Sequence, residues 1–171
     1  MIGSAEICRF PDFAAPPGEV VDSVLVSSLL RGIIGAPAVL RLGPVAPLTP
    51  GLALLPLTGA VLAAFQPPGR ILPADVEPLP VVAAALAEWS AAGPVAYVEF
   101  SFVSDAQLAA VWDHGARVLG PLLSPSAEGR PVARALRRLG VDAVGHDDEF
   151  DAAGLSRHRT VADWHRTAAG S

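Results

Sequence analysis

The sequence predicts an α+β fold in which an antiparallel meander sheet, over about residues 96–122, packs against several helices. Residues 96–103 alternate apolar and polar side chains with the period of a strand. Two further apolar segments follow on either side of Asp113-His114-Gly115, a sequence typical of a hairpin turn. Elsewhere, Pro and Gly stand at the start and end of segments with helical spacing, which indicates helices beside the sheet.

The chain has the size and composition of one domain. It has 171 residues, of which 51% are hydrophobic, so we expect a single domain over 1–171 whose core needs no metal or disulfide. A proline-rich connector over 66–80 is where a boundary between two lobes would fall.

In the N-terminal half, apolar spacing and turn residues predict short elements. A strand over 5–10 contains the single cysteine, Cys8, which we interpret as a buried structural thiol. Further elements are expected as a helix over 19–30, strands over 38–42 and 52–55, and a helix from a Thr58 cap to about Phe65.

In the C-terminal half, three helices flank the predicted meander. The first follows Pro80 and ends before Gly93, and the second runs from Pro131 to Gly140. Thr160 and Asp163 resemble a capping box that begins a last short helix containing Trp164.

The first strand of the meander makes a further prediction about burial. Its alternation places Val98, Phe100 and Phe102 on one face, which we expect to be buried against the helices. Tyr97, Glu99 and Ser101 lie on the other face, and the alternation predicts that Glu99 faces solvent.

Charge and hydropathy exclude several classes of function. The formal net charge is −5 and no basic stripe is present beyond Arg134, Arg137 and Arg138, so nucleic-acid binding is not expected. The uncharged stretch over 42–69 is divided by prolines, which disrupt a spanning helix. The first residues do not have the pattern of a signal peptide, so we expect a cytoplasmic protein with no membrane partner.

The sequence lacks familiar catalytic patterns. No Gly-x-Ser-x-Gly, Walker loop or Gly-x-Gly-x-x-Gly is present. The acids at 147–151 lack the spacing of a calcium loop, and the histidines are not spaced as a pair on one helical face. Arg157 and Arg159 bracket His158 and would repel a cation. We therefore assign no catalytic residue, no metal ligand and no cofactor.

Four blocks of the sequence resemble a group of small actinobacterial proteins that has no assigned activity. The blocks are Ala96-Tyr97-Val98-Glu99, Val111-Trp112-x-x-Gly115, the segment 133–141, and the ending 148–159. The resemblance covers roughly residues 80–165 and implies a bacterial cytoplasmic protein with an α+β fold. In size and composition the chain also looks like immunity proteins, which bind and block a toxin made by the same cell.

Two hypotheses of function follow. The first is a non-enzymatic protein-binding module, in its sharpest form an immunity or inhibitor protein whose partner is a protein such as a basic toxin. Its predicted interface combines acids, arginines and an aromatic anchor: Asp147, Asp148, Glu149, Asp151, Arg157, Arg159 and Trp164. Trp164 has an alternative role, which is to dock the last helix onto the core. The second hypothesis is a small enzyme or a metal- or ligand-binding protein that uses the acids and histidines of the same segment.

Overall fold

The computed structural model of the chain describes residues 29–35, 43–65, 78–124 and 129–170. The elements follow in the order β1 (Leu29–Gly35), β2 (Ala46–Pro47), β3 (Ala53–Pro56), α2 (Gly59–Ala64), α3 (Pro78–Trp89), η2 (Ser90–Ala92), β4 (Val95–Ser101), β5 (Gln107–Asp113), β6 (Ala116–Leu123), α4 (Pro131–Arg138), α5 (Glu149–Ala152), η3 (Leu155–Arg157) and α6 (Val161–Ala169).

The strands form one six-stranded sheet in the order β2-β3-β1-β4-β5-β6, and every neighbouring pair is antiparallel. The α+β class and the meander over about 96–122 are therefore confirmed, with β4, β5 and β6 as its three strands. The sheet also extends further than the meander. β1 pairs with β4 and places Arg31 directly opposite Glu99, so strands from both sides of the 66–80 connector share the sheet.

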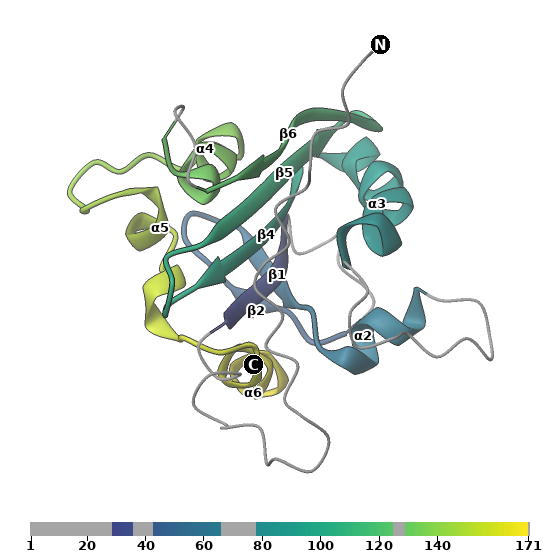
Figure 1. Cartoon of the computed structure of the whole chain (residues 1–171), viewed down its shortest axis with the longest axis horizontal. Coiled ribbons are helices and arrows are strands. Elements are labelled where there is room, and N and C mark those ends of the chain that lie inside the picture. The colour runs from purple at the N-terminus through teal and green to yellow at the C-terminus, as the bar shows by residue number, and fades with distance from the viewer. Residues whose placement is uncertain (1–28, 36–42, 66–77, 125–128, 171) are drawn as a thin grey trace.

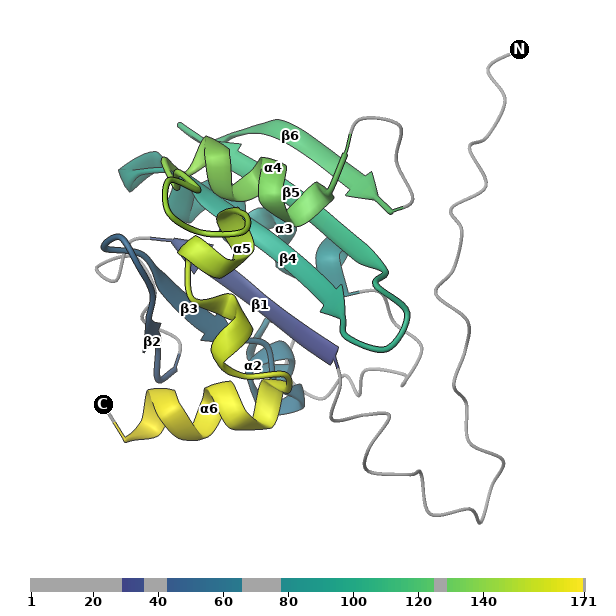
Figure 2. The ribbon, with the colours of Figure 1, turned by 90° about the vertical axis from the view of Figure 1, so that its left-hand side faces the viewer.

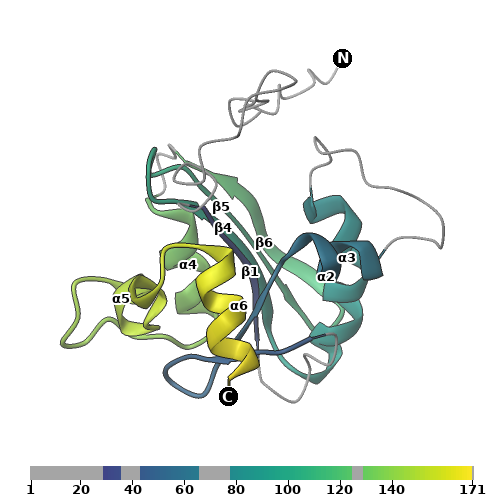
Figure 3. The same ribbon diagram turned by 90° about the horizontal axis from the view of Figure 1, so that it is seen from below.

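Helices cover both faces of this sheet (Figure 1). On one face lie α4, α5 and α6, whose Val132, Leu136 and Trp164 pack with Leu30, Val98 and other side chains of the sheet. On the other face lie α2 and α3, packed on residues that include Tyr97 and Trp112. Figure 3 shows the sheet between the two helical layers. Side chains on both faces of the strands are therefore buried.

Several local predictions are confirmed. Thr58 accepts a hydrogen bond from the Val61 amide and begins α2, and Thr160 accepts one from the Asp163 amide and begins α6. Pro131 is the first residue of α4. The β5–β6 turn is tighter than expected, because only two residues, His114 and Gly115, connect the strands, with φ of 50° and 80°.

The helix predicted over 19–30 can be compared with the structure at residues 29 and 30, and there the prediction is wrong. Residues 29–35 form β1, whose Leu30, Ile33 and Ile34 are fully buried between the two helical layers. Apolar runs of this length fit a buried strand as well as a helix, and the pairing of β1 with both β3 and β4 decides between them. The predictions for 5–10 with Cys8, for 19–28 and for 38–42 lie outside the described residues.

The burial prediction for β4 also needs correction. Glu99 does not face solvent, since only 6% of it is exposed. Val98 is buried as expected, but Phe100 is half-buried, and Phe102 lies half-buried in the turn after the strand. Alternation predicted one covered face, whereas this sheet has two.

Both edges of the sheet are poorly suited to pairing with another strand. β2 has only two residues, one of them Pro47. β6 changes register twice against β5 and contains Pro121, which has no amide hydrogen to donate. Within the described part of the chain, no helix has the length and apolar character required to cross a membrane.

Candidate functional site

The most deeply buried charged group in the described residues is the carboxylate of Glu99. Arg31 Nη2 lies 3.3 Å from Glu99 Oε2, and the hydroxyl of Tyr97 donates a short hydrogen bond to Glu99 Oε1. Both partners reach Glu99 because Arg31 is its cross-strand neighbour and Tyr97 precedes it by two residues on the same face.

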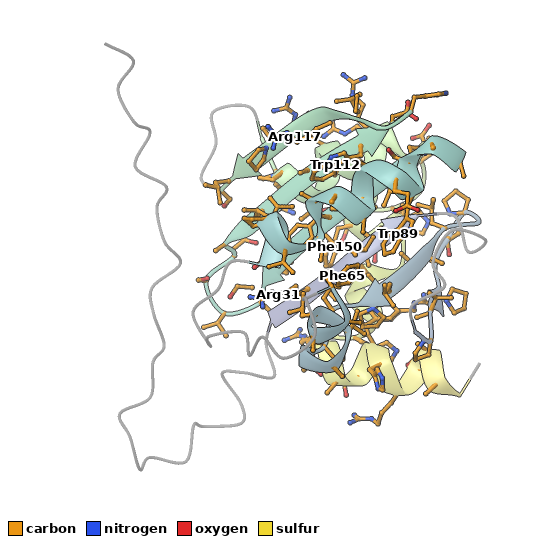
Figure 4. All side chains as sticks on the ribbon, turned by 90° about the vertical axis from the view of Figure 1, so that its right-hand side faces the viewer. Arg31, Phe65, Trp89, Trp112, Arg117 and Phe150 are labelled. Atoms are coloured by element: carbon orange, nitrogen blue, oxygen red, sulfur yellow. The ribbon has the colours of Figure 1, made fainter. Side chains whose placement is uncertain are left out.

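This cluster has the character of an internal ion pair. The side chain of Arg31 is 27% exposed, and Figure 4 shows it at one end of β1, away from Trp89 and Trp112. Its Nη2 is held by Glu99, while its Nε is buried without a hydrogen-bond partner. Within the described residues, no group of three or more His, Cys, Asp or Glu side chains is placed to hold a metal ion.

The acids predicted to recognise a partner lie on α5 or just before it, and two of the four, Asp148 and Glu149, bind arginines of the same chain. Asp148 caps α5 by accepting from the Asp151 amide, and its Oδ2 lies 2.8 Å from Arg130 Nη1. Glu149 Oε1 lies 2.7 Å from Arg137 Nε. These contacts fasten α5 to α4, and among the four acids they leave Asp147 as the exposed one.

Asp151 is held by two neighbours. Its Oδ2 lies 3.0 Å from His146 Nδ1, and its Oδ1 accepts a hydrogen bond from the Ser156 hydroxyl at 3.0 Å. The hydrogen bond with His146, followed by that with Ser156, lowers the pKa of Asp151 from its ordinary value of 3.8. Asp151 is therefore a carboxylate at neutral pH and ties the loop before α5 to the segment after it.

Trp164 is fully buried, so it is not available as an exposed anchor. Its indole N–H donates to the His158 carbonyl at 3.2 Å, and the guanidinium of Arg157 lies 5.3 Å from its ring centroid. Arg157 also donates to the Pro47 carbonyl at 2.7 Å. Trp164 and Arg157 thus hold α6 and η3 on the sheet, which is the docking role given as the alternative for Trp164.

An aromatic cluster that the sequence did not predict lies beside these residues. Phe100, Phe102 and Phe150 are half-buried and in mutual contact, with ring centroids 4.6, 4.7 and 6.0 Å apart. The exposed Arg159 places its guanidinium 5.8 Å from the Phe102 ring centroid. Val103, which follows Phe102, is 60% exposed. We call Phe100, Phe102, Phe150, Val103 and Arg159 the aromatic patch.

Comparisons with known proteins leave the function of this patch open. No family model matches the chain, and no curated protein or solved structure matches it at a significant level.

Acidic residues border the aromatic patch in the sequence. Asp105 is exposed in the β4–β5 turn that carries Phe102 and Val103, and Asp147 and Asp151 flank Phe150 in sequence. Arg159 is the exposed cation within the patch. Half-buried aromatic rings with an arginine and an acidic rim have the composition of an interface hot spot.

Proposed function

We propose that the chain is a non-enzymatic protein-binding module of the bacterial cytoplasm, and that the aromatic patch is its principal contact with a partner protein. The observation that carries the proposal is the mutual contact of Phe100, Phe102 and Phe150 at the surface, with the guanidinium of Arg159 over Phe102. Rings that hold one another need little ordering when a partner covers them, so their burial contributes more of its free energy to binding.

The charges favour a basic partner. The chain carries a formal charge of −5. Asp105 is exposed in the turn that carries Phe102 and Val103, and Asp147 is exposed in the loop that leads into α5. Such a rim attracts a positively charged protein and accelerates its association at low salt. A basic toxin held by an immunity or inhibitor protein is a partner of this kind.

The alternative is a small enzyme or a ligand-binding protein that uses the acids and histidines of the C-terminal segment. The geometry favours it less, because Asp148, Glu149 and Asp151 are engaged by Arg130, Arg137 and His146. The imidazole of His158 is likewise engaged, with its Nε2 2.9 Å from the Thr167 hydroxyl. These contacts fix the fold of the segment and occupy the named side chains, which a substrate or metal would otherwise use.

The test is capture of a partner from the native host, followed by titration of the purified partner. Phe102→Ala should weaken binding about 30-fold, the change that corresponds to a hot-spot loss of about 2 kcal/mol. Val118→Ala is the matched control, because Val118 is 46% exposed but lies on β6, away from the patch. Association with the wild type should slow as salt is raised. Equal affinity of the Phe102 variant and the wild type would reject the patch as the contact.

A further inference from the structure

The connection between α4 and α5, residues 139–148, projects from the body of the protein (Figures 1 and 3). Near its tip stands Val144, which is 82% exposed. The other exposed large hydrophobic residues of the described chain are Val103, at 60%, and Val118, at 46%. An isolated exposed valine is ordinary on a protein surface. Val144 differs because it is held at the tip of a loop that is fixed along its length.

The base of the loop is fixed at both ends. At its start, Val141 is buried and its amide donates to the Leu136 carbonyl of α4 at 3.0 Å. At its end, Asp148 caps α5 and forms an ion pair with Arg130. Both ends are thus attached to α4 or to the residue that caps it, and the inner face of α4 lies in the core.

The tip is fixed as well. The Val144 amide donates to Asp142 Oδ1 at 3.1 Å, and the His146 amide donates to the Ala143 carbonyl at 2.9 Å, which closes a turn. Gly145 has φ of 82° in this turn, a conformation that favours glycine. The His146 ring then contacts Asp151 on α5. The hydrogen bonds of the turn and the His146–Asp151 contact hold Val144 outward.

We propose that residues 139–148 form a preformed recognition loop that inserts Val144 into an apolar recess of the partner, a recess with a basic rim. The inference rests on the proposed function and adds a second contact to it. The charge follows from the loop itself, since Asp142 and Asp147 are exposed and the loop contains neither arginine nor lysine. A loop fixed before binding loses little conformational freedom when it is bound.

The loop and the aromatic patch lie on the same side of the molecule. Phe150, a member of the patch, is the second residue of α5, and the loop leads directly into that helix. Figure 2 shows α4, α5 and the loop between them on the near side of the sheet, together with α6. A single partner surface can therefore cover both contacts.

The first arm of the test needs no partner. Backbone 15N relaxation of the whole chain should give Val144 an order parameter close to the value of about 0.85 found in rigid backbone. His146→Ala, which removes the contact to Asp151, should lower the order parameter at residues 144–146. A wild-type value below about 0.6 would overturn the inference, because the loop would then not be preformed.

The second arm uses the partner captured and purified as described above. Val144→Ser should weaken binding at least tenfold, and Val118→Ser should leave it unchanged. A photo-crosslinking residue at position 144 should attach to a segment of the partner that contains basic and apolar residues, whereas one at position 118 should not attach. Circular dichroism and thermal unfolding check that each variant retains its fold.

The outcomes separate the two proposals. Binding that depends on Phe102 but not on Val144 overturns the recognition loop and leaves the aromatic patch as the contact. Binding that depends on Val144 but not on Phe102 supports the loop and rejects the patch. If the wild type retains no stoichiometric partner, the proposed function fails and the loop inference fails with it.

Discussion

Substitutions at Arg31 and Glu99 should show that the two side chains form one buried, coupled unit. Arg31→Met leaves the carboxylate of Glu99 at a position that is 6% exposed, with its arginine removed. Breaking a buried ion pair in this way typically costs about 3–5 kcal/mol. We expect about 3 kcal/mol, at the lower end of that range, because the side chain of Arg31 is 27% exposed and its loss gives water a path to the carboxylate.

Glu99→Leu should cost less, about 2 kcal/mol, because the guanidinium that remains can turn toward solvent. The double variant Arg31→Met/Glu99→Leu should also lose only about 2 kcal/mol, since the apolar pair leaves no buried charge, while Tyr97 loses its carboxylate acceptor. The two single changes sum to about 5 kcal/mol, so the expected coupling free energy is about 3 kcal/mol.

Urea unfolding followed by circular dichroism measures these differences. With a denaturant slope of about 2 kcal/mol/M, Arg31→Met should shift the midpoint by about 1.5 M. Arg117→Met is the control, because Arg117 is exposed on β6, as Figure 4 shows, and its loss should change the free energy of unfolding by less than about 0.5 kcal/mol. A double variant as unstable as the sum of its two single variants would refute the reasoning.

Three further predictions concern stability. Because the pKa of Asp151 is lowered in the folded protein, its ionised form stabilises the fold above pH 3.8, and this stabilisation is lost as the pH falls through the lower folded value. The difference in the free energy of unfolding between wild type and Asp151→Asn, measured from pH 2 to 7, should therefore shrink below pH 3.8. A difference that grew below pH 3.8 would contradict the assignment. Gly120→Ala should lower the free energy of unfolding by about 2–5 kcal/mol, since φ is 76° and the new Cβ would lie 2.5 Å from the Ala109 carbonyl oxygen. Gly145→Ala, with open space around its Cβ, should cost about 1–2 kcal/mol in thermal unfolding. Equal losses would show that the close contact at Gly120 is relieved without cost. Trp164→Ala should cost about 3–5 kcal/mol in the free energy of unfolding, as expected of a core residue, and a loss under 1 kcal/mol would reject its docking role.

Much of the fold follows from local signals in the sequence. The caps at Thr58 and Thr160, the proline that begins α4 and the turn after β5 are each determined by a few neighbouring residues, and each lies where it was predicted. The strand β1 was not predicted as a strand, because a short apolar run is compatible with either type of element. Only its pairing with β3 and β4, which are distant in sequence, selects the strand.

The buried state of Glu99 could not be predicted for the same reason. Alternation along β4 shows that two faces exist, but it does not show that α2 and α3 cover the second one. The ion pair depends on the register that places Arg31 opposite Glu99 across 68 residues of sequence. The aromatic patch is a comparable case, since it brings Phe150 from α5 to Phe100 and Phe102 at the end of β4. No spacing within one segment indicates this contact.

The charge that a segment carries in sequence is not the charge that it offers to a partner. In the run from Asp147 to Asp151, three acids have a basic side chain of the same chain within 3.0 Å, and these contacts join α4, α5 and the loop. Alanine at Asp147, Asp148 and Glu149 together would therefore detach α5 from α4 as well as remove charge, and a lost partner could not be assigned to either cause. Asp147→Asn with Asp142→Asn removes exposed charge, and neither residue forms an ion pair within the described chain. Asparagine at position 142 also keeps a side-chain oxygen that can accept the hydrogen bond from the Val144 amide. If a basic partner is steered by this surface, the asparagine pair should slow association at low salt and leave the thermal unfolding temperature unchanged.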